Sequence, residues 1–199
     1  MYGLINQGLH DLAVQVGGEE LWSEIKSSAG VGVEAFVAMD TYPDDLTYRL
    51  VEAASIAMHI SPAEVLHAFG KHWILYTGRR GYGAIFDTMG HDLPEFFANL
   101  DTMHDRLSLS MPDMRPPSFV CDQIGDHQIR LEYWSERDGL APMIPGLLEG
   151  LGEMYRVTVS VEHSVDRAQG ADHDEFIISY VAIATTPAAS RHAAVAADA

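Results

Sequence analysis

The sequence contains a single cysteine, Cys121, and no long apolar run. One cysteine cannot form a disulfide within the chain, and it excludes the multi-cysteine sites that bind zinc or iron–sulfur clusters. No stretch approaches the roughly 18 uninterrupted apolar residues that a membrane-spanning helix needs. The first residues also lack the basic flank and the cleavage site of a secretory signal peptide. These absences predict a cytoplasmic protein that does not enter the membrane.

Positive charge is also scarce. The 199 residues include 12 lysines and arginines against 29 aspartates and glutamates, which gives a formal net charge of −17. Such a chain repels phosphate backbones and anionic lipid surfaces, so nucleic acid is not an expected partner. With 47% hydrophobic residues, the chain is long enough to bury a substantial core in one or two lobes.

Helical periodicity dominates the first half of the chain. Ser61, Pro62 and Glu64 form a capping box with a first-turn proline, which is a strong signal for a helix start. Asp92 begins a further helix in the same way, and the glycines at 78, 81 and 83 predict a flexible connection before it. In chain order, the predicted helices are 4–16, 19–28, 44–58, one from 61 and one from 92.

The period changes after Pro117. Alternating apolar and polar residues predict two pairs of antiparallel strands with a helix between the pairs. The predicted elements are strands 118–124 and 127–135, a helix at 141–154, and strands 155–165 and 175–184. Helices followed by a sheet are typical of an α+β fold. Residues 185–199 are rich in alanine with little to bury, and we predict that they are disordered.

His104 shares one helical stripe with apolar residues, including Phe97, Leu100 and Leu107. A histidine in this position is either a core residue whose ring nitrogens find backbone partners or a metal ligand, and the pattern alone leaves both open. Pro116 and Pro117 follow a dozen residues later. Because proline fixes its own backbone and restricts the residue before it, they predict a stiff path from this helix to the first strand.

Tyr133, Ser135 and Arg137 alternate within a predicted strand. Side chains two residues apart project from the same face of a strand, so a phenol, a hydroxyl and a guanidinium should converge. Arginine binds carboxylates in a bidentate manner, and this trio therefore suits a ligand that carries a carboxylate. An ordinary polar strand face is the alternative.

Taken together, these features resemble the haem nitric oxide/oxygen-binding (H-NOX) family, which is related to the haem domain of soluble guanylate cyclase. The likeness extends over about residues 1–184 through the ordered stretches MYGLIN, FGKHWILYT, LPEFFANLDTMH, RPPSF and GLAPM. It implies one α+β domain with haem b bound between two lobes. The distal helical lobe would span about residues 1–60, and the proximal lobe, with a four-stranded antiparallel sheet, about 61–184.

The resemblance also implies roles for individual residues. His104 would be the axial ligand of the haem iron, since imidazole nitrogen binds iron well. The haem propionates would be bound by Tyr133, Ser135 and Arg137, and Pro117 would press on the porphyrin. The distal side would be covered by Met1, Ile5, Leu9, Trp73 and Met143.

The identity of the bound gas is predicted from the absence of one hydrogen-bond donor on the distal side. Oxygen-binding members of the family have a distal tyrosine that donates a hydrogen bond to dioxygen, and the matching position here is Pro142. Trp73 is a weaker candidate donor. The resemblance therefore implies a sensor, not an enzyme, that binds nitric oxide and carbon monoxide at ferrous haem and discriminates against oxygen. Release of His104 would carry the signal to a separate partner, either a histidine kinase or a diguanylate cyclase.

Two other functions compete with this prediction. An oxygen-binding or peroxidase-like haem protein would need a distal acid/base group, for which His72 is the nearby candidate. An adaptor that binds its partner without haem would leave His104 unexplained.

Other polar residues have simpler interpretations. We interpret the loop that contains His163 and His173 as a solvated acidic loop rather than a divalent-metal site. His67 and His72 are five residues apart, which is the wrong spacing for a zinc pair on one helix face. Cys121 is interpreted as a small core residue. Pro145 is expected to kink its helix.

Overall fold

The computed structural model describes residues 1–183, so the predicted disordered tail at 185–199 lies outside the described part of the chain. Helices precede a four-stranded antiparallel sheet with strand order β1-β2-β4-β3, which confirms the predicted α+β fold. None of the described helices is both long and apolar enough to cross a membrane. The elements are α1 (Gly3–Ser28), α2 (Asp44–Met58), α3 (Pro62–His72), the π-helix η1 (Trp73–Thr77), α4 (Gly78–Phe86), α5 (Leu93–Ser108), β1 (Ser118–Gly125), β2 (Gln128–Trp134), α6 (Met143–Tyr155), β3 (Val157–Val165), the short 3-10 helix η2 (Arg167–Gln169) and β4 (Asp174–Ala182).

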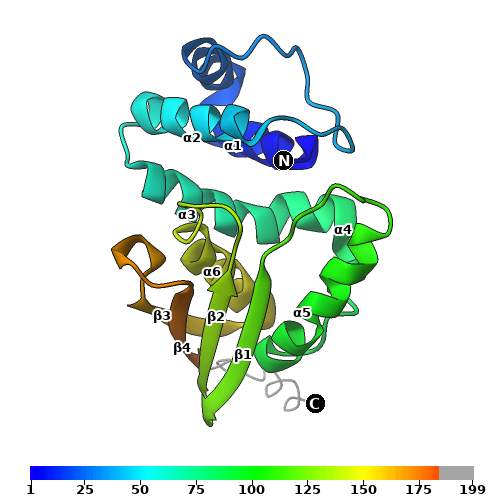
Figure 1. The fold of residues 1–199 in the computed structure, drawn as a ribbon, viewed down its shortest axis with the longest axis vertical. Helices are drawn as coiled ribbons and strands as arrows, with labels where there is room; N and C mark the ends of the chain where they lie inside the picture. Colours follow the sequence, from blue (N-terminus) through cyan, green and yellow to red (C-terminus); the bar gives the residue numbers. More distant parts are fainter. Residues whose placement is uncertain (184–199) are drawn as a thin grey trace, which may run out of the picture.

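The helices α1 and α2 lie together at one end of the molecule, with α3 crossing beneath them, whereas the sheet, α5 and α6 form the other end (Figure 1). Each end has its own apolar core. The first core is centred on buried residues of α1, α2 and α3, such as Ile25, Leu50 and Val65. The second is formed by α5, α6 and the inner face of the sheet, where alternate residues of β2 and β4 are buried.

Two local signals in the sequence are realised as hydrogen bonds. Ser61 and Glu64 form the predicted capping box, in which the Glu64 N–H donates to Ser61 Oγ at 3.2 Å and the Ser61 N–H donates to Glu64 Oε2 at 2.7 Å. Asp92 caps α5 by accepting the Glu95 N–H at 2.9 Å. These caps fix where α3 and α5 begin, and α5 is the helix that carries His104.

Two predicted boundaries differ from the structure. Helices 4–16 and 19–28 are one element, α1, with a kink at Gly18, whose φ is 74°. The predicted flexible connection at 78–83 is wrong, because α3 continues through η1 into α4. Gly78 serves close packing: a Cβ there would lie 2.8 Å from the Phe86 ring and 2.9 Å from the Trp73 carbonyl.

Candidate functional site

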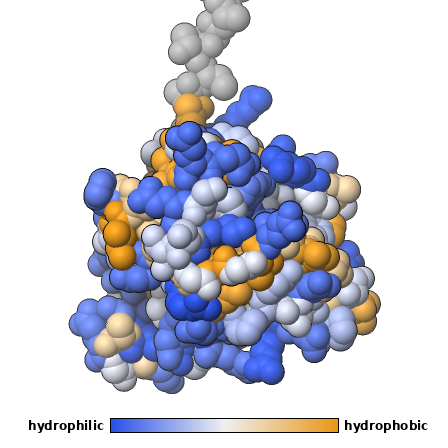
Figure 2. All heavy atoms as spheres, turned by 90° about the horizontal axis from the view of Figure 1, so that it is seen from above, coloured by the Kyte–Doolittle hydropathy of each residue, from blue (hydrophilic) through white to orange (hydrophobic). Residues whose placement is uncertain are grey.

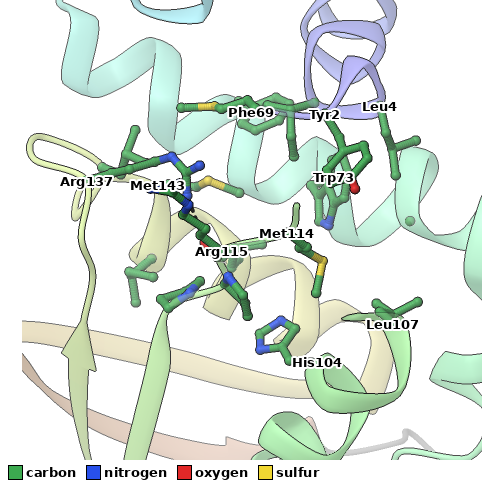
Figure 3. Close-up of a pocket in the computed structure, with 18 of the residues that line it drawn as sticks. Tyr2, Leu4, Phe69, Trp73, His104, Leu107, Met114, Arg115, Arg137 and Met143 are labelled. Atoms are coloured by element: carbon green, nitrogen blue, oxygen red, sulfur yellow. Dashed lines mark hydrogen bonds between the residues drawn. The ribbon is translucent and has the colours of Figure 1, made fainter. Parts of the chain in front are cut away.

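A cavity of about 560 Å³ lies between the two cores. Its walls come from α1, α2, α3 and η1 on one side and from α5, the segment 109–117, β2 and α6 on the other. Most of the lining is apolar, and a few polar groups converge on it, as is typical of a site for a small organic cofactor. Figure 3 shows Phe69 and Trp73 on one side of this space and His104 on the opposite side.

His104 is held on α5 by the apolar stripe that packs into the second core. Its ring stacks on Phe119, with centroids 6.1 Å apart and planes at 29°. The ring nitrogen Nδ1 is buried and has no hydrogen-bond partner among residues 1–183. Buried polar atoms of ordinary core residues almost always find a partner. An unpartnered ring nitrogen on a histidine that lines a cavity therefore favours a ligand over a core histidine.

The charge state of His104 also suits metal binding. Burial lowers the pKa of its imidazole, and the opposing effect of Asp101 and Asp105 does not compensate. A lowered pKa keeps the ring neutral at neutral pH, so that a lone pair is available to a metal ion.

Tyr133, Ser135 and Arg137 do come together, but not as predicted. The strand β2 ends at Trp134, so Ser135 and Arg137 lie in the following loop and their convergence does not come from strand alternation. The loop turns back because the Arg137 N–H donates to Ser135 Oγ at 3.0 Å. Tyr133 and Arg137 line the cavity, whereas Ser135 is not among the lining residues.

Burial raises the pKa of Tyr133 in spite of the nearby Ser135 hydroxyl, so its phenol stays protonated and can donate a hydrogen bond. The Arg137 guanidinium is engaged on two sides. Its Nε donates to Asp44 Oδ2 at 2.7 Å, and its Nη1 donates to the Arg115 carbonyl at 2.7 Å. Arg137 therefore ties α2 and the segment 109–117 to the loop after β2.

Asp44 is a site residue that the sequence did not reveal. It accepts hydrogen bonds from Arg137 and from the amino group of Met1. Partial burial raises the pKa of Asp44, but these hydrogen bonds and positive charges outweigh it and hold the pKa below its usual value of 3.8. In the sequence Asp44 is an ordinary acidic residue at a helix start, and nothing local distinguishes it from Asp45.

The expected distal residues all line the cavity, as does Pro117. Trp73 presses the benzo edge of its indole against α1, since a Cβ on Gly8 would lie 3.2 Å from that edge. The opposite edge, which carries the indole nitrogen, faces the cavity in Figure 3. The expected distal residues are Met1, Ile5, Leu9, Trp73 and Met143.

Two prolines, Pro142 and Pro145, lie at the start of α6. Pro142 precedes the helix and is not among the lining residues, which here are Leu140 and Met143. Pro145 does not kink α6, contrary to expectation. It occupies the third position of the helix, where a missing N–H and a fixed φ are tolerated.

His72 does not reach the cavity. It is 6% exposed, stacks on Tyr76 at 4.9 Å and is not among the lining residues. The peroxidase-like alternative therefore loses its acid/base candidate. His67 does not pair with His72 either, because its Nε2 lies 3.1 Å from Glu149 Oε1.

The remaining polar candidates are engaged in local contacts. His163 Nε2 lies 2.9 Å from Asp174 Oδ1, and Asp166, close to both, caps η2 by accepting the Ala168 N–H at 2.8 Å. Burial raises the pKa of the Cys121 thiol to about 11, which makes the thiol a poor nucleophile at neutral pH. Neither region lines the cavity.

Comparison with known proteins decides the family. The family model described as Haem-NO-binding matches residues 2–163. The chain belongs to this family. It is a haem-binding gas-sensor domain related to soluble guanylate cyclase, whose cyclase activity lies in other domains. The family assignment made from the ordered motifs is confirmed.

The matched relatives are much longer proteins. Soluble guanylate cyclase gcy-35 of Caenorhabditis elegans is 29% identical over 191 residues, which cover 94% of this chain and 27% of the relative. Guanylate cyclase soluble subunit beta-2 of Rattus norvegicus is 30% identical over 120 residues, covering 57% and 18% of the two chains. This H-NOX chain thus spans about a quarter or less of the length of these cyclases.

Solved structures share the fold. An H-NOX protein from S. oneidensis in the Fe(II)NO ligation state has a TM-score of 0.83 at 21% identity, covering 91% of this chain and 99% of that one. An oxygen-binding H-NOX domain, solved as its oxygen complex, has a TM-score of 0.75 at 21% identity, with coverages of 90% and 95%. Since both proteins share the fold, the fold does not decide which gas is bound.

The cavity fits haem in three respects. A porphyrin needs apolar walls, and most of the cavity lining is apolar. An iron ion needs a neutral imidazole, which the lowered pKa of His104 provides. Two propionates need hydrogen-bond donors and positive charge at one edge, where Tyr133, Arg115 and Arg137 line the cavity.

Proposed function

We propose that this H-NOX domain binds haem b and senses nitric oxide, with carbon monoxide as a second ligand and with discrimination against oxygen. The observation that carries this proposal is the neutral imidazole of His104, which lines an apolar cavity and has a buried Nδ1 without a hydrogen-bond partner among residues 1–183. We further propose that residues 1–184 act as one unit, with a distal lobe at about 1–60 and a proximal lobe at about 61–184.

His104 would hold the iron, and the bound haem would supply the coordination site for the gas. Tyr133 and Arg137 would bind the propionates directly, and Ser135 would support them by accepting the Arg137 N–H. Because Arg137 already contacts Asp44 and Arg115, it would keep a propionate at the junction of the two lobes. Pro117 would contact the porphyrin face, and the distal face would be covered by Met1, Ile5, Leu9, Trp73 and Met143.

Discrimination against oxygen is inferred from what α6 contributes to the cavity. Its lining residues are all apolar, and Pro142 carries no donor. Bound dioxygen carries partial negative charge and needs a hydrogen-bond donor for stability, whereas nitric oxide and carbon monoxide need much less help. The lining residues from α6 are Met143, Ile144, Leu147, Leu148 and Leu151.

Oxygen binding is the second candidate, and Trp73 favours it. The nitrogen-bearing edge of its indole faces the cavity in Figure 3. An indole N–H in this position could donate to a ligand. The Trp73→Phe variant separates the two candidates, because it removes the donor and keeps an aromatic wall.

The signal that this domain passes to its partner would be a movement of its helices and lobes. If His104 no longer held a bound haem, α5 would be free to move, and the segment that contains Pro117 would move with it. The result would be a shift in population between two arrangements of the lobes. We propose that a histidine kinase or a diguanylate cyclase reads this shift.

The first experiment is an anaerobic absorption spectrum of the reduced protein, before and after nitric oxide and then in air. We expect five-coordinate ferrous haem that remains five-coordinate with nitric oxide and gives no stable oxygen complex. The His104→Gly variant should bind haem with an affinity at least about 100-fold lower than that of the wild type unless imidazole is added. The variant removes the direct ligand of the iron, and loss of a residue that only supports such a ligand already lowers metal affinity by about 10–100-fold.

His67→Gly is the matched control, because it makes the same change at a helical position that does not line the cavity. It should retain haem and its spectrum. A colourless wild type would overturn the proposal. An oxygen complex that is lost in Trp73→Phe would replace it with the oxygen-binding candidate.

A further inference from the structure

One hydrogen bond joins the first residues of the chain to the segment that follows the His104 helix. The backbone N–H of Asp113 donates to the hydroxyl of Tyr2 at 3.1 Å, across 111 positions of sequence. Both residues line the cavity. The contact therefore connects the helical end of the molecule to the connection between α5 and β1.

The Tyr2 phenol is held rigidly on its own side. Tyr2 forms an isolated antiparallel bridge with Thr41, and the flanking Gly3 N–H donates to the Asp40 carbonyl at 2.8 Å. The side chain is 8% exposed. Because the backbone on both sides of Tyr2 is anchored, the hydroxyl has a fixed position from which to hold Asp113.

The first residues of segment 109–117 are anchored to the end of α5, where the Met111 N–H donates to the Leu107 carbonyl at 2.9 Å, and the rest of the segment has few other anchors. Met111 is buried, the Met114 N–H donates to the Met111 carbonyl at 2.9 Å, and the Arg115 carbonyl accepts from Arg137 at 2.7 Å. The same segment ends in Pro116 and Pro117 and begins directly after α5. A displacement of either end must therefore pass through Asp113.

We propose that Tyr2 is a positioning residue that couples the two lobes during gas sensing. Its hydroxyl holds segment 109–117 against the N-terminal helices, so that a movement of His104 or Pro117 is transmitted to α1. This inference rests on the proposed haem function. Without the hydroxyl, the segment loses its direct contact with the start of α1 and remains linked to the N-terminal helices through Arg137 and Asp44 of α2.

The test is hydrogen exchange of the full-length, haem-loaded ferrous protein, with and without nitric oxide, for wild type and Tyr2→Phe. The variant removes one hydrogen bond and almost no volume. Exchange of the peptide 109–117 should become about 2- to 12-fold faster, as expected for loss of one hydrogen bond. The change in exchange that nitric oxide causes in α1 of the wild type should disappear.

Tyr42→Phe is the matched control. The Tyr42 hydroxyl also accepts a backbone N–H, from Val37, at the same distance of 3.1 Å, but within the N-terminal region. It should leave both readouts for 109–117 and α1 unchanged. Asp113→Asn keeps the N–H donor and should also match wild type.

The outcomes separate this inference from the proposed function. Absorption spectra of the same samples report haem and nitric oxide binding, so a failure of the proposed function is visible there. If the wild type binds nitric oxide but Tyr2→Phe exchanges like wild type in 109–117, or if α1 responds equally in both proteins, Tyr2 does not couple the lobes.

Discussion

The two ends of the molecule contribute different things to the cavity. The N-terminal end, formed by α1, α2 and α3, provides mostly apolar wall, including Ile5, Leu9 and Phe69. The C-terminal end provides the candidate ligand His104 and the donors Tyr133 and Arg137. One end therefore defines the shape of the pocket, and the other provides most of its chemistry.

The joints between the ends also differ. At the crossing of α3 and α6 the backbones are in contact, since a Cβ on Gly146 would lie 1.9 Å from the His67 carbonyl oxygen. Across the cavity the ends are joined by polar contacts, such as those of Arg137 with Asp44 and of Tyr48 with the Asp138 carbonyl. Close packing makes the first joint stiff, whereas exposed polar contacts can exchange with water. A switch that separates the two ends at the polar contacts and keeps the close packing of α3 against α6 fits this arrangement.

The outer surface of the helical end carries apolar groups among its polar ones. Figure 2, which views the molecule from above, shows hydrophobic residues in a band between hydrophilic ones. Val16, Met39 and Ile56, which lie at this end, are at least half exposed. Single exposed apolar side chains are normal, so they carry no functional argument.

The largest effects are expected from cavities of equal size in the two cores. Leu50 and Leu148 are each 1% exposed, and each should lose about 2–5 kcal/mol of unfolding free energy when changed to alanine. Only Leu148 lines the cavity, so Leu148→Ala should also speed haem dissociation. Denaturant titration and haem-transfer kinetics measure the two effects. Equal haem loss in Leu50→Ala would show that the helical end controls more than shape.

A single added methyl group should disrupt the close packing between α3 and α6. Gly146→Ala should destabilise the protein by about 1–3 kcal/mol, because the added Cβ meets backbone that cannot move aside. Gly81→Ala is the control: no atom lies within 4 Å of a Cβ there, so it should stabilise α4 by about 0.5–1 kcal/mol. Thermal unfolding compares them, and an unchanged stability in Gly146→Ala would contradict a close-packed joint.

The stability that the ion pair between Asp44 and Arg137 contributes should depend on pH. The pKa of Asp44 is lowered in the folded protein, so its contribution is complete above the usual value of 3.8 and is lost as the pH falls below that value through the folded pKa. Because Asp44 is 40% exposed, Asp44→Asn should cost only about 0.2–1 kcal/mol at pH 7. Unfolding titrations at several pH values should show the difference from wild type vanish in acid.

Asp45→Asn is the control for this measurement. Asp45 pairs with Arg49 one turn along the same helix and is 77% exposed, so its loss should be smaller. A cost at Asp44 no larger than that at Asp45 would show that the ion pair between the ends adds no more stability than an exposed pair within one helix.

Local patterns in the sequence determined much of the helical and strand structure. The caps at Ser61 and Asp92, the apolar stripe on α5 and the alternation in β2 each depend on residues within one or two turns, so they can be recognised without the fold. The same patterns put His104 on a buried face, and the ordered motifs identified the family.

Tertiary structure decided the rest. Position 78 lies within a continuous helical segment and has no room for a side chain, because a Cβ there would meet the Phe86 ring and the Trp73 carbonyl. Arg137 meets Asp44 from 93 positions away, and Tyr2 meets Asp113 from 111 positions away. Such pairs form only when the helical end and the sheet pack around a shared cavity, and this packing depends on the fit of whole surfaces rather than on any local period.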